Sequence, residues 1–216
     1  MRDAGIGVAL MNLDGGYLGS GERGFAGVPG RDESFRRGLP IVLDLADLLG
    51  CHRLHALAGR RAPGHRREDQ LRLLESSLAF AADIAPPDTT ITLEVLNSTD
   101  VPGYLVPDSR SALAVIDWVG RPNLGLQLDV YHLTMEGEDP VEVIRVAAGR
   151  ITHVQFADVP GRHELGTGSI PFQNLLLALD AVGYCGAIGL EYIPSRPEAP
   201  DLSFVEALAA ISGPNP

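Results

Sequence analysis

Thr92-Leu-Glu-Val-Leu-Asn97 decides the fold: it is an apolar run of the kind that forms a buried strand, and it carries one acid, Glu94. In three later stretches Asp129, Gln155 or Glu191 takes the corresponding place. These stretches are Gln127-Leu-Asp-Val-Tyr-His132, His153-Val-Gln-Phe-Ala-Asp158 and Gly189-Leu-Glu-Tyr192. Segments with the apolar period of a helix separate them, which is typical of parallel strand–helix units. Functional side chains of such sheets and barrels lie at the carboxyl ends of the strands, so we expect these side chains to converge.

The same pattern along the whole chain predicts six strand–helix units. The strands are expected at Val8–Asn12, His52–Leu57, Thr90–Leu96, Leu124–Val130, Ile151–Ala157 and Ala187–Tyr192. The helices are expected at Asp32–Leu49, Glu68–Ala85, Ser109–Val119, Pro140–Ala148, from Pro171 onward, and at Leu202–Ile211. Pro40 falls inside the first helix and is expected to kink it or to mark its true start, because proline removes a helical hydrogen bond.

Six units predict an α/β protein that is a (β/α)8 TIM barrel truncated at its N-terminus, forming one incomplete domain over residues 1–216. A complete barrel has eight strands and about 250 residues. The helix-like start, Met1 to Gly7, places the two absent units at the front. An open, doubly wound sheet with six strands is the alternative. It is less favoured, because its crevice lies between two strands and would not readily bring together polar groups from four. Bare strand edges pair readily with other chains, which leaves a homo-oligomer open.

Composition excludes several classes of protein. The formal net charge is −11 and the pI about 4.9, which argues against nucleic acid as a partner because phosphate binding needs a basic face. Cys51 and Cys185 match no metal or redox spacing, and no signal peptide or membrane-length apolar run is present. We expect a reduced, cytoplasmic protein that acts on small molecules.

Glu94, Asp129, Gln155 and Glu191 together predict a metal site. A carboxylate among apolar neighbours is costly unless it is paired or bound to a metal. For one such residue, a buried salt bridge or a strand-end cap is an equal alternative. Three carboxylates and one amide oxygen at equivalent places in four repeats favour a divalent cation, Mg²⁺ or Mn²⁺, which both prefer oxygen ligands.

Charge balance then predicts cationic groups beside the metal. Three carboxylates and a divalent ion leave a net charge of about −1, so an anionic substrate needs further positive groups. Arg162, His163 and His132 follow the fifth and fourth strands and are candidates for substrate binding, although each alone is more often a surface or capping residue. His55 points toward the same end of the sheet. Asn97 begins a loop that closes over a substrate or forms a plain turn.

Two other polar features receive structural interpretations. His153 lies two residues before Gln155, and so deeper in the barrel, where a structural role is expected. The loop from Gly59 to Arg67 is basic, with Arg60, Arg61, Arg66 and Arg67. A solvated loop is favoured there over an anion site.

The motifs of the chain resemble the hydroxypyruvate isomerase family of xylose-isomerase-like TIM barrels. The stretches that carry the resemblance are Glu94–Tyr104, Gly120–Leu124, Gln127–His132, His153–Gln155, Ala157–Glu164, Gly166–Gly168 and Gly189–Tyr192. The resemblance implies a divalent metal held by Glu94, Asp129, Gln155 and Glu191, with Glu94 and Glu191 as the proton donor and acceptor pair. The absent front and Pro40 depart from the family pattern.

The activity implied by the resemblance is an intramolecular oxidoreduction that interconverts hydroxypyruvate and tartronate semialdehyde. The metal would polarise the carbonyl and hydroxyl oxygens of an enediolate, while glutamates move the proton between neighbouring carbons. Arg162 and His132 would hold the carboxylate or the oxyanion. The alternatives are a sugar or 2-oxo-acid isomerase or epimerase of the same superfamily, and an inactive truncated remnant. A zinc-dependent DNA-repair nuclease is disfavoured by the low pI and by the six histidines.

Overall fold

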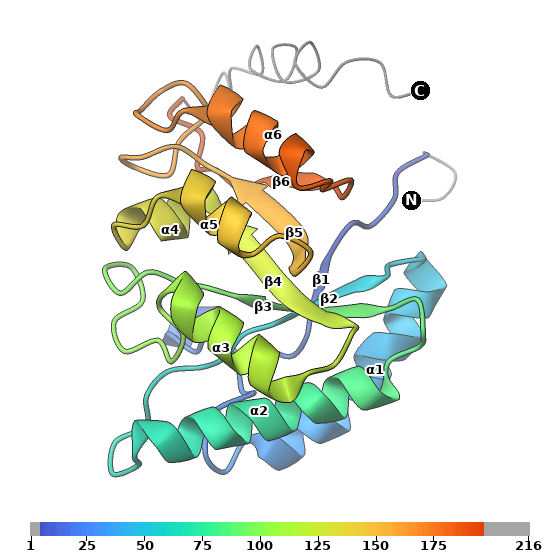
Figure 1. Cartoon of the computed structure of the whole chain (residues 1–216). Coiled ribbons are helices and arrows are strands. Elements are labelled where there is room, and N and C mark those ends of the chain that lie inside the picture. The colour runs from blue at the N-terminus through green and yellow to red at the C-terminus, as the bar shows by residue number, and fades with distance from the viewer. Residues whose placement is uncertain (1–4, 197–216) are drawn as a thin grey trace.

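The computed structural model describes residues 5–196, and within them six parallel strands form one sheet in chain order (Figure 1). Every neighbouring pair is parallel. The strands are β1 (Met11–Asn12), β2 (Arg53–Ala56), β3 (Thr90–Glu94), β4 (Leu124–Asp129), β5 (Ile151–Phe156) and β6 (Ile188–Leu190). The predicted α/β fold with six parallel strands is confirmed, and the sheet curls as part of a barrel.

The helices lie outside the curled sheet, and most consecutive helices pack on each other (Figure 1). They are α1 (Asp32–Leu49), α2 (Arg67–Ile84), α3 (Ser109–Val119), α4 (Val130–Met135), α5 (Pro140–Val146) and α6 (Phe172–Ala181), with a short 3-10 helix, η2 (Leu18–Ser20). Amphipathic sequences of this kind cover one face of a sheet with their apolar stripe. No helix in the described part of the chain is long and apolar enough to cross a bilayer.

Alternation along each strand separates an apolar outer face from a polar inner face. In β3, Ile91 and Leu93 are fully buried in the core toward the helices, where Leu74 of α2 is also fully buried. Thr92 and Glu94 lie on the opposite face, because successive side chains of a strand point to opposite sides. The polar groups of the strands therefore share the inner surface of the curl, as the sequence predicts.

Side-chain bonds across the interior show how strongly the sheet is curled. The Nε atom of Arg53 on β2 donates to the carbonyl of Thr152 on β5, at 2.9 Å. The hydroxyl of Thr152 lies 3.0 Å from that of Thr92 on β3. Two strands separate β2 from β5 along the sheet, so a flat sheet could not bring these atoms together. Among the described residues β1 and β6 each pair with a single strand and form the sheet edges.

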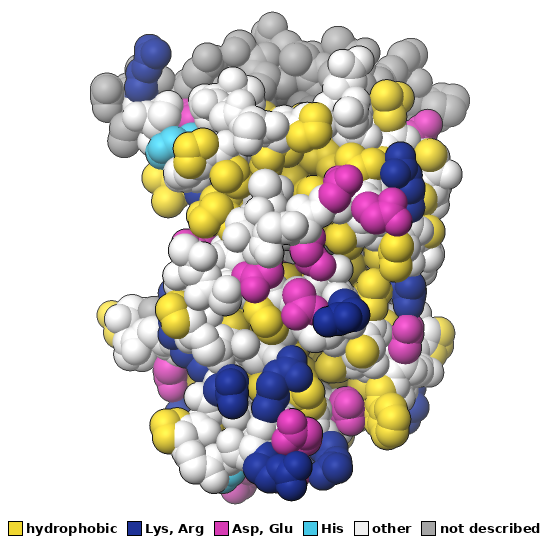
Figure 2. Space-filling view, turned by 60° about the vertical axis from the view of Figure 1, so that its left-hand side comes forward, with side chains coloured by type: hydrophobic (Ala, Val, Ile, Leu, Met, Phe, Trp, Pro, Cys, Tyr) yellow, Lys and Arg dark blue, Asp and Glu magenta, His cyan; other side chains and the backbone are white. Residues whose placement is uncertain are grey.

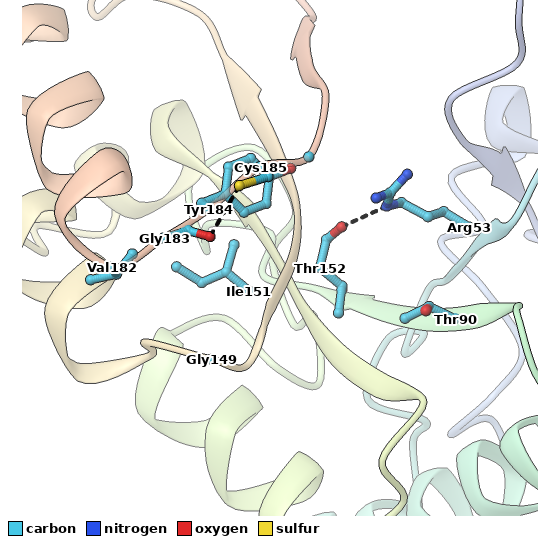
Figure 3. Close-up of a pocket in the computed structure, with 10 residues that line it drawn as sticks. Arg53, Thr90, Gly149, Ile151, Thr152, Val182, Gly183, Tyr184 and Cys185 are labelled. Atoms are coloured by element: carbon cyan, nitrogen blue, oxygen red, sulfur yellow. Dashed lines mark hydrogen bonds between the residues drawn. The ribbon is translucent and has the colours of Figure 1, made fainter. Parts of the chain in front are cut away.

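A cavity of about 350 Å³ opens at the amino ends of the strands (Figure 3). Its lining includes Arg53, Thr90 and Thr152 from the beginnings of three strands, and Tyr184 from the segment that precedes β6. In barrels, this end serves stability and the opposite end carries the chemistry. The cavity is therefore not the candidate active site.

Two predictions of local structure need correction, and one of the two alternatives for Pro40 is excluded. Pro40 does not mark the start of α1, because the helix already begins at Asp32 and continues to Leu49. The strand expected at Leu124–Val130 ends at Asp129, and the short helix α4 follows it directly, a helix that the sequence did not predict. β1 has two residues instead of the five expected. The helix expected at residues 202–211 lies outside the described part of the chain.

Candidate active site

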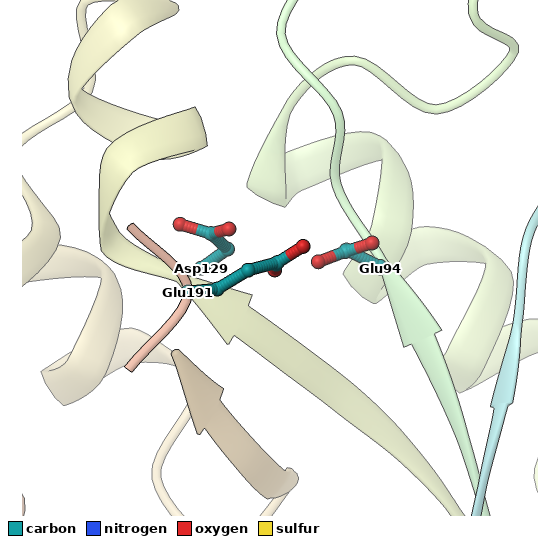
Figure 4. A group of neighbouring side chains, drawn as sticks. All are labelled: Glu94, Asp129 and Glu191. Carbon is teal, nitrogen blue, oxygen red and sulfur yellow. The ribbon is translucent and has the colours of Figure 1, made fainter. Parts of the chain in front are cut away.

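Three predicted carboxylates converge at the carboxyl end of the sheet (Figure 4). Glu94 ends β3, Asp129 ends β4 and Glu191 directly follows β6. One oxygen from each lies within 4.8 Å of the others. Glu94 and Asp129 are buried, whereas the side chain of Glu191 is 52% exposed. This arrangement gives a compact acidic cluster that is open on the side of Glu191.

Two glutamine amides connect the cluster. Gln127 Nε2 donates to Glu94 Oε1 at 2.9 Å and to Gln155 Oε1 at 2.6 Å. Gln155 Nε2 in turn donates to Glu191 Oε2 at 2.8 Å. Gln127 was not predicted as a site residue, although it shares a strand face with Asp129 two positions later. Its own amide oxygen is buried and accepts no hydrogen bond from a described residue.

His55 on β2 lies beside Glu94. Its Nδ1 atom is 3.0 Å from Asn12 Oδ1, and its Nε2 atom is 3.1 Å from Glu94 Oε2. The His55 side chain is only 5% exposed. Asn12 was not predicted as a site residue, although it lies at the carboxyl end of the first predicted strand and Glu94 and Asp129 lie near the carboxyl ends of later ones.

His132 is held as a neutral donor beside Asp129. Its Nδ1 atom accepts the backbone N–H of Asn97 at 3.2 Å, so the proton of the neutral ring resides on Nε2. That nitrogen lies 3.8 Å from Asp129 Oδ2. Burial lowers the pKa of His132 to about 4, which keeps the ring uncharged near neutrality. Asn97 is fully buried and also donates to Asp100, so the structure gives it a supporting position behind the site.

Arg162 brings a positive charge onto the cluster. Its Nη2 atom lies 2.9 Å from Glu191 Oε2 and 3.3 Å from Asp129 Oδ2, and its Nε donates to the Glu191 carbonyl. The guanidinium carbon is 5.0 Å from the centre of the Tyr131 ring, a cation–π distance. The backbone of Arg162 has φ of 57°, a left-handed conformation that non-glycine residues seldom adopt.

Asp158 fixes the loop that carries Arg162. Its fully buried carboxylate accepts four backbone N–H groups, from Val159, Gly166, Gly168 and Ile170. A side chain at Gly168 would collide with the Val159 carbonyl, so only glycine fits there. The loop is therefore organised around one acid, which leaves little freedom for Arg162.

His163 has a different surrounding from the one predicted. Its Nδ1 atom lies 2.8 Å from the carbonyl of Ile193, so the ring ties its loop to the segment after β6. It does not line the site pocket, which has a volume of about 290 Å³. Six of the nine predicted site residues do line it, namely His55, Glu94, His132, Gln155, Arg162 and Glu191. Asp129, Asn97 and His163 are the other three.

Electrostatics within the cluster favour a bound cation. Burial, together with the charges of Glu94 and Glu191, raises the pKa of Asp129 well above its usual value. Burial also raises the pKa of Glu191. Burial alone would raise the pKa of Glu94. The opposing effect of the nearby His55, His132 and Gln127 is larger, so the pKa of Glu94 is lowered. Three close carboxylates repel each other, two of them are buried, and a divalent ion, whose preferred ligands are oxygens, would stabilise them.

His153 should make stability depend on pH. Burial, aided by the charge of Arg53, lowers the pKa of His153 from its ordinary 6.5 to about 4. Between these two pKa values the unfolded chain binds a proton at His153 and the folded chain does not. The free energy of unfolding should therefore fall as the pH drops below about 6.5. We expect His153→Gln to flatten that fall in urea titrations between about pH 7 and about pH 5. Parallel curves for the two proteins would contradict a neutral, buried His153.

The curled parallel sheet and its acidic edge define a class of protein, the α/β barrel proteins whose functional groups lie at the carboxyl ends of the strands. The sequence matches the family described as xylose isomerase-like TIM barrel over residues 1–211. The chain belongs to this family, and within it to the hydroxypyruvate isomerase family.

Two relatives and one solved structure illustrate the match. Hydroxypyruvate isomerase of Escherichia coli is 37% identical over 86% of this chain and 72% of its own length. The 2-oxo-tetronate isomerase of Cupriavidus necator is 38% identical over 88% of this chain and 74% of its own. The crystal structure of AP endonuclease, family 2, from Brucella melitensis superposes with a TM-score of 0.86 at 35% identity, over 90% of this chain and 76% of that one.

Proposed function

We propose that the protein is a metal-dependent isomerase that interconverts hydroxypyruvate and tartronate semialdehyde. One observation carries the proposal: Glu94, Asp129 and Glu191 come from three different strands and meet within 4.8 Å, beside the cation of Arg162. Such a site offers metal ligands, proton carriers and a partner for a carboxylate at one place. The hydroxypyruvate isomerase of Escherichia coli supports the choice of substrate. All six strands belong to one sheet, which supports a single working domain.

The donor set suits Mg²⁺ or Mn²⁺. Glu94, Asp129 and Glu191 would each supply a carboxylate oxygen, and Gln155 would supply its amide oxygen, which accepts one hydrogen bond from the described residues and has a second lone pair for a metal. When bound, the cation would act as a Lewis acid on the carbonyl and hydroxyl oxygens of the substrate.

Side chains of the protein would carry out proton transfer and bind the substrate. Glu94 and Glu191 would remove a proton from the carbon beside the carbonyl and return one to its neighbour, as general base and acid. His132 would donate its Nε2 proton to a substrate oxygen, in keeping with its neutral state. Arg162 would bind the substrate carboxylate, because a cation placed among Asp129 and Glu191 frees the guanidinium from its present partners.

Replacing Arg162 by alanine should mainly raise KM. A residue that binds the carboxylate equally in ground and transition states contributes to KM and leaves kcat nearly unchanged. We expect an increase of about tenfold or more, since a charge-assisted hydrogen bond contributes about 1.5–3 kcal/mol. Arg145→Ala is the matched control, because this arginine is exposed on α5 and pairs with Glu142. A fall in kcat at constant KM would move Arg162 from binding to stabilisation of the transition state.

A second candidate is the isomerisation of a longer 2-oxo acid. The 2-oxo-tetronate isomerase of Cupriavidus necator, as similar to this chain as the hydroxypyruvate isomerase, favours it. Purified protein with Mg²⁺ or Mn²⁺ should be given hydroxypyruvate and 2-oxo-tetronate separately, and the products followed by NMR, with chelator as the control. Turnover of one acid that disappears with chelator supports the corresponding activity. A folded, metal-loaded protein inactive on both would overturn the proposal in favour of a remnant without catalytic activity.

A further inference from the structure

A third cavity, which is basic, lies between the loops that follow β1 and β2. It has a volume of about 250 Å³, and its lining includes Arg23 and Arg31 from the first loop and Arg60 and Arg61 from the second. In the view of Figure 2, many of the visible Lys and Arg side chains, which are all arginines in this chain, lie in the lower half. One carboxylate, Glu22, is also part of the lining.

Arginines outnumber carboxylates among the residues that line this cavity. Glu22 pairs with Arg31 at 3.2 Å, and the Arg31 guanidinium lies 3.7 Å from the centre of the Phe25 ring. Arg60 donates one Nη1 bond to the Pro102 carbonyl, while its Nε is buried without a hydrogen-bond partner among the described residues. Four arginines and one glutamate are thus among the residues that line the cavity, in a chain whose net charge is −11.

The cavity adjoins the candidate active site. Arg23 lines both this cavity and the site pocket that contains Glu94 and Glu191. Both loops leave the carboxyl ends of their strands, which is the edge of the sheet where the acidic cluster lies. An anion held by the arginines would therefore lie next to a small molecule in the site pocket.

We infer that this cavity binds a small oxyanion, the phosphate or carboxylate group of a small molecule. Guanidinium groups bind such groups through paired hydrogen bonds, and several around one cavity surround an anion from different directions. The buried Nε of Arg60 is a donor that such an anion would satisfy, and an unsatisfied buried donor is costly. A solvated basic loop would explain Arg61, Arg66 and Arg67. It does not explain why Arg23 and Arg31, from another loop, line the same cavity as Arg60.

Calorimetric titration of the full chain with inorganic phosphate, at constant ionic strength, tests the site without any need for activity. Arg61→Gln should weaken binding about tenfold, since one charge-assisted contact is lost, and its exposed position keeps the fold intact. Arg60→Gln should weaken binding similarly. Arg66→Gln is the control, because Arg66 lies in the same loop, pairs with Glu68 and does not line the cavity.

Equal binding by the wild type, Arg61→Gln and Arg66→Gln, or no binding at millimolar phosphate, would overturn the inference. If phosphate binds, a competition experiment distinguishes an anionic group of the substrate from a separate anionic ligand. Competition between phosphate and the isomerisation substrate identifies the cavity as the place for the far end of a longer or phosphorylated substrate. Binding of phosphate without competition identifies a separate anionic ligand.

Discussion

Glu94→Gln and Glu191→Gln should each lower kcat by about 10²–10⁴-fold, the range typical for loss of a general acid or base. Glutamine keeps the size and the hydrogen-bonding oxygen of the side chain but cannot take up a proton at neutral pH. Gln127 Nε2 can still donate to an amide oxygen at position 94, so the local geometry should survive. The measurement is the steady-state rate with hydroxypyruvate and with 2-oxo-tetronate.

The matched control for this pair is Glu142→Gln. Glu142 lies on α5, and its side chain is 61% exposed and pairs only weakly with Arg145. Its replacement should leave kcat unchanged. If Glu94→Gln and Glu191→Gln, while folded and still binding metal, retain wild-type rates, the assignment of the proton carriers is wrong.

Saturating Mn²⁺ should raise the thermal midpoint of the wild type by about 5–10 °C and leave that of Asp129→Asn almost unchanged. Binding at 100 times the dissociation constant stabilises by about 2.7 kcal/mol, and each kcal/mol shifts the midpoint by about 2–4 °C in a domain of this size. Asparagine can still accept the Tyr131 N–H that Asp129 now caps at 2.8 Å, so α4 should persist.

The pKa of Asp129 predicts which of the two proteins, the wild type or Asp129→Asn, is more stable without metal. Because its pKa is raised in the folded state, ionising Asp129 costs stability as the pH rises through that pKa. Above this pH, the metal-free Asp129→Asn protein should be at least as stable as the wild type. A metal-induced shift of equal size in both proteins would show that Mn²⁺ binds elsewhere.

The sequence predicted the strands and their polar ends because both depend on local order. Glu94 and Asp129 stand at the ends of apolar runs, and a parallel sheet brings such ends together whatever the loops do. The short helix α4 was missed because the apolar run Leu124–Val130 continues past the point where Asp129 turns the backbone and caps the next helix.

What the sequence could not show depends on contacts between distant loops. Arg23 and Arg60 are far apart in the chain, and only the folding of the loops after β1 and β2 brings them to one cavity. From the sequence alone, a solvated loop is therefore the simpler interpretation of residues 59–67. His163 likewise has the residue type of a substrate ligand, but its position on the loop aims it at the Ile193 carbonyl. The role predicted for it stays untested.

The bonds from Arg53 to Thr152 and from Thr152 to Thr92 bear on how the molecule opens. They join strands that are not neighbours, so β2 to β5 cannot be peeled away one at a time and should unfold as one cooperative unit. β6 is short, lies at an edge of the described sheet and is tied mainly to β5, and local opening is cheapest in such places. Glu94 and Asp129 thus lie on the cooperative part, whereas Glu191 follows an edge strand, which should open more readily than the central strands. Brief detachment of this strand would disassemble the acidic cluster without unfolding the core.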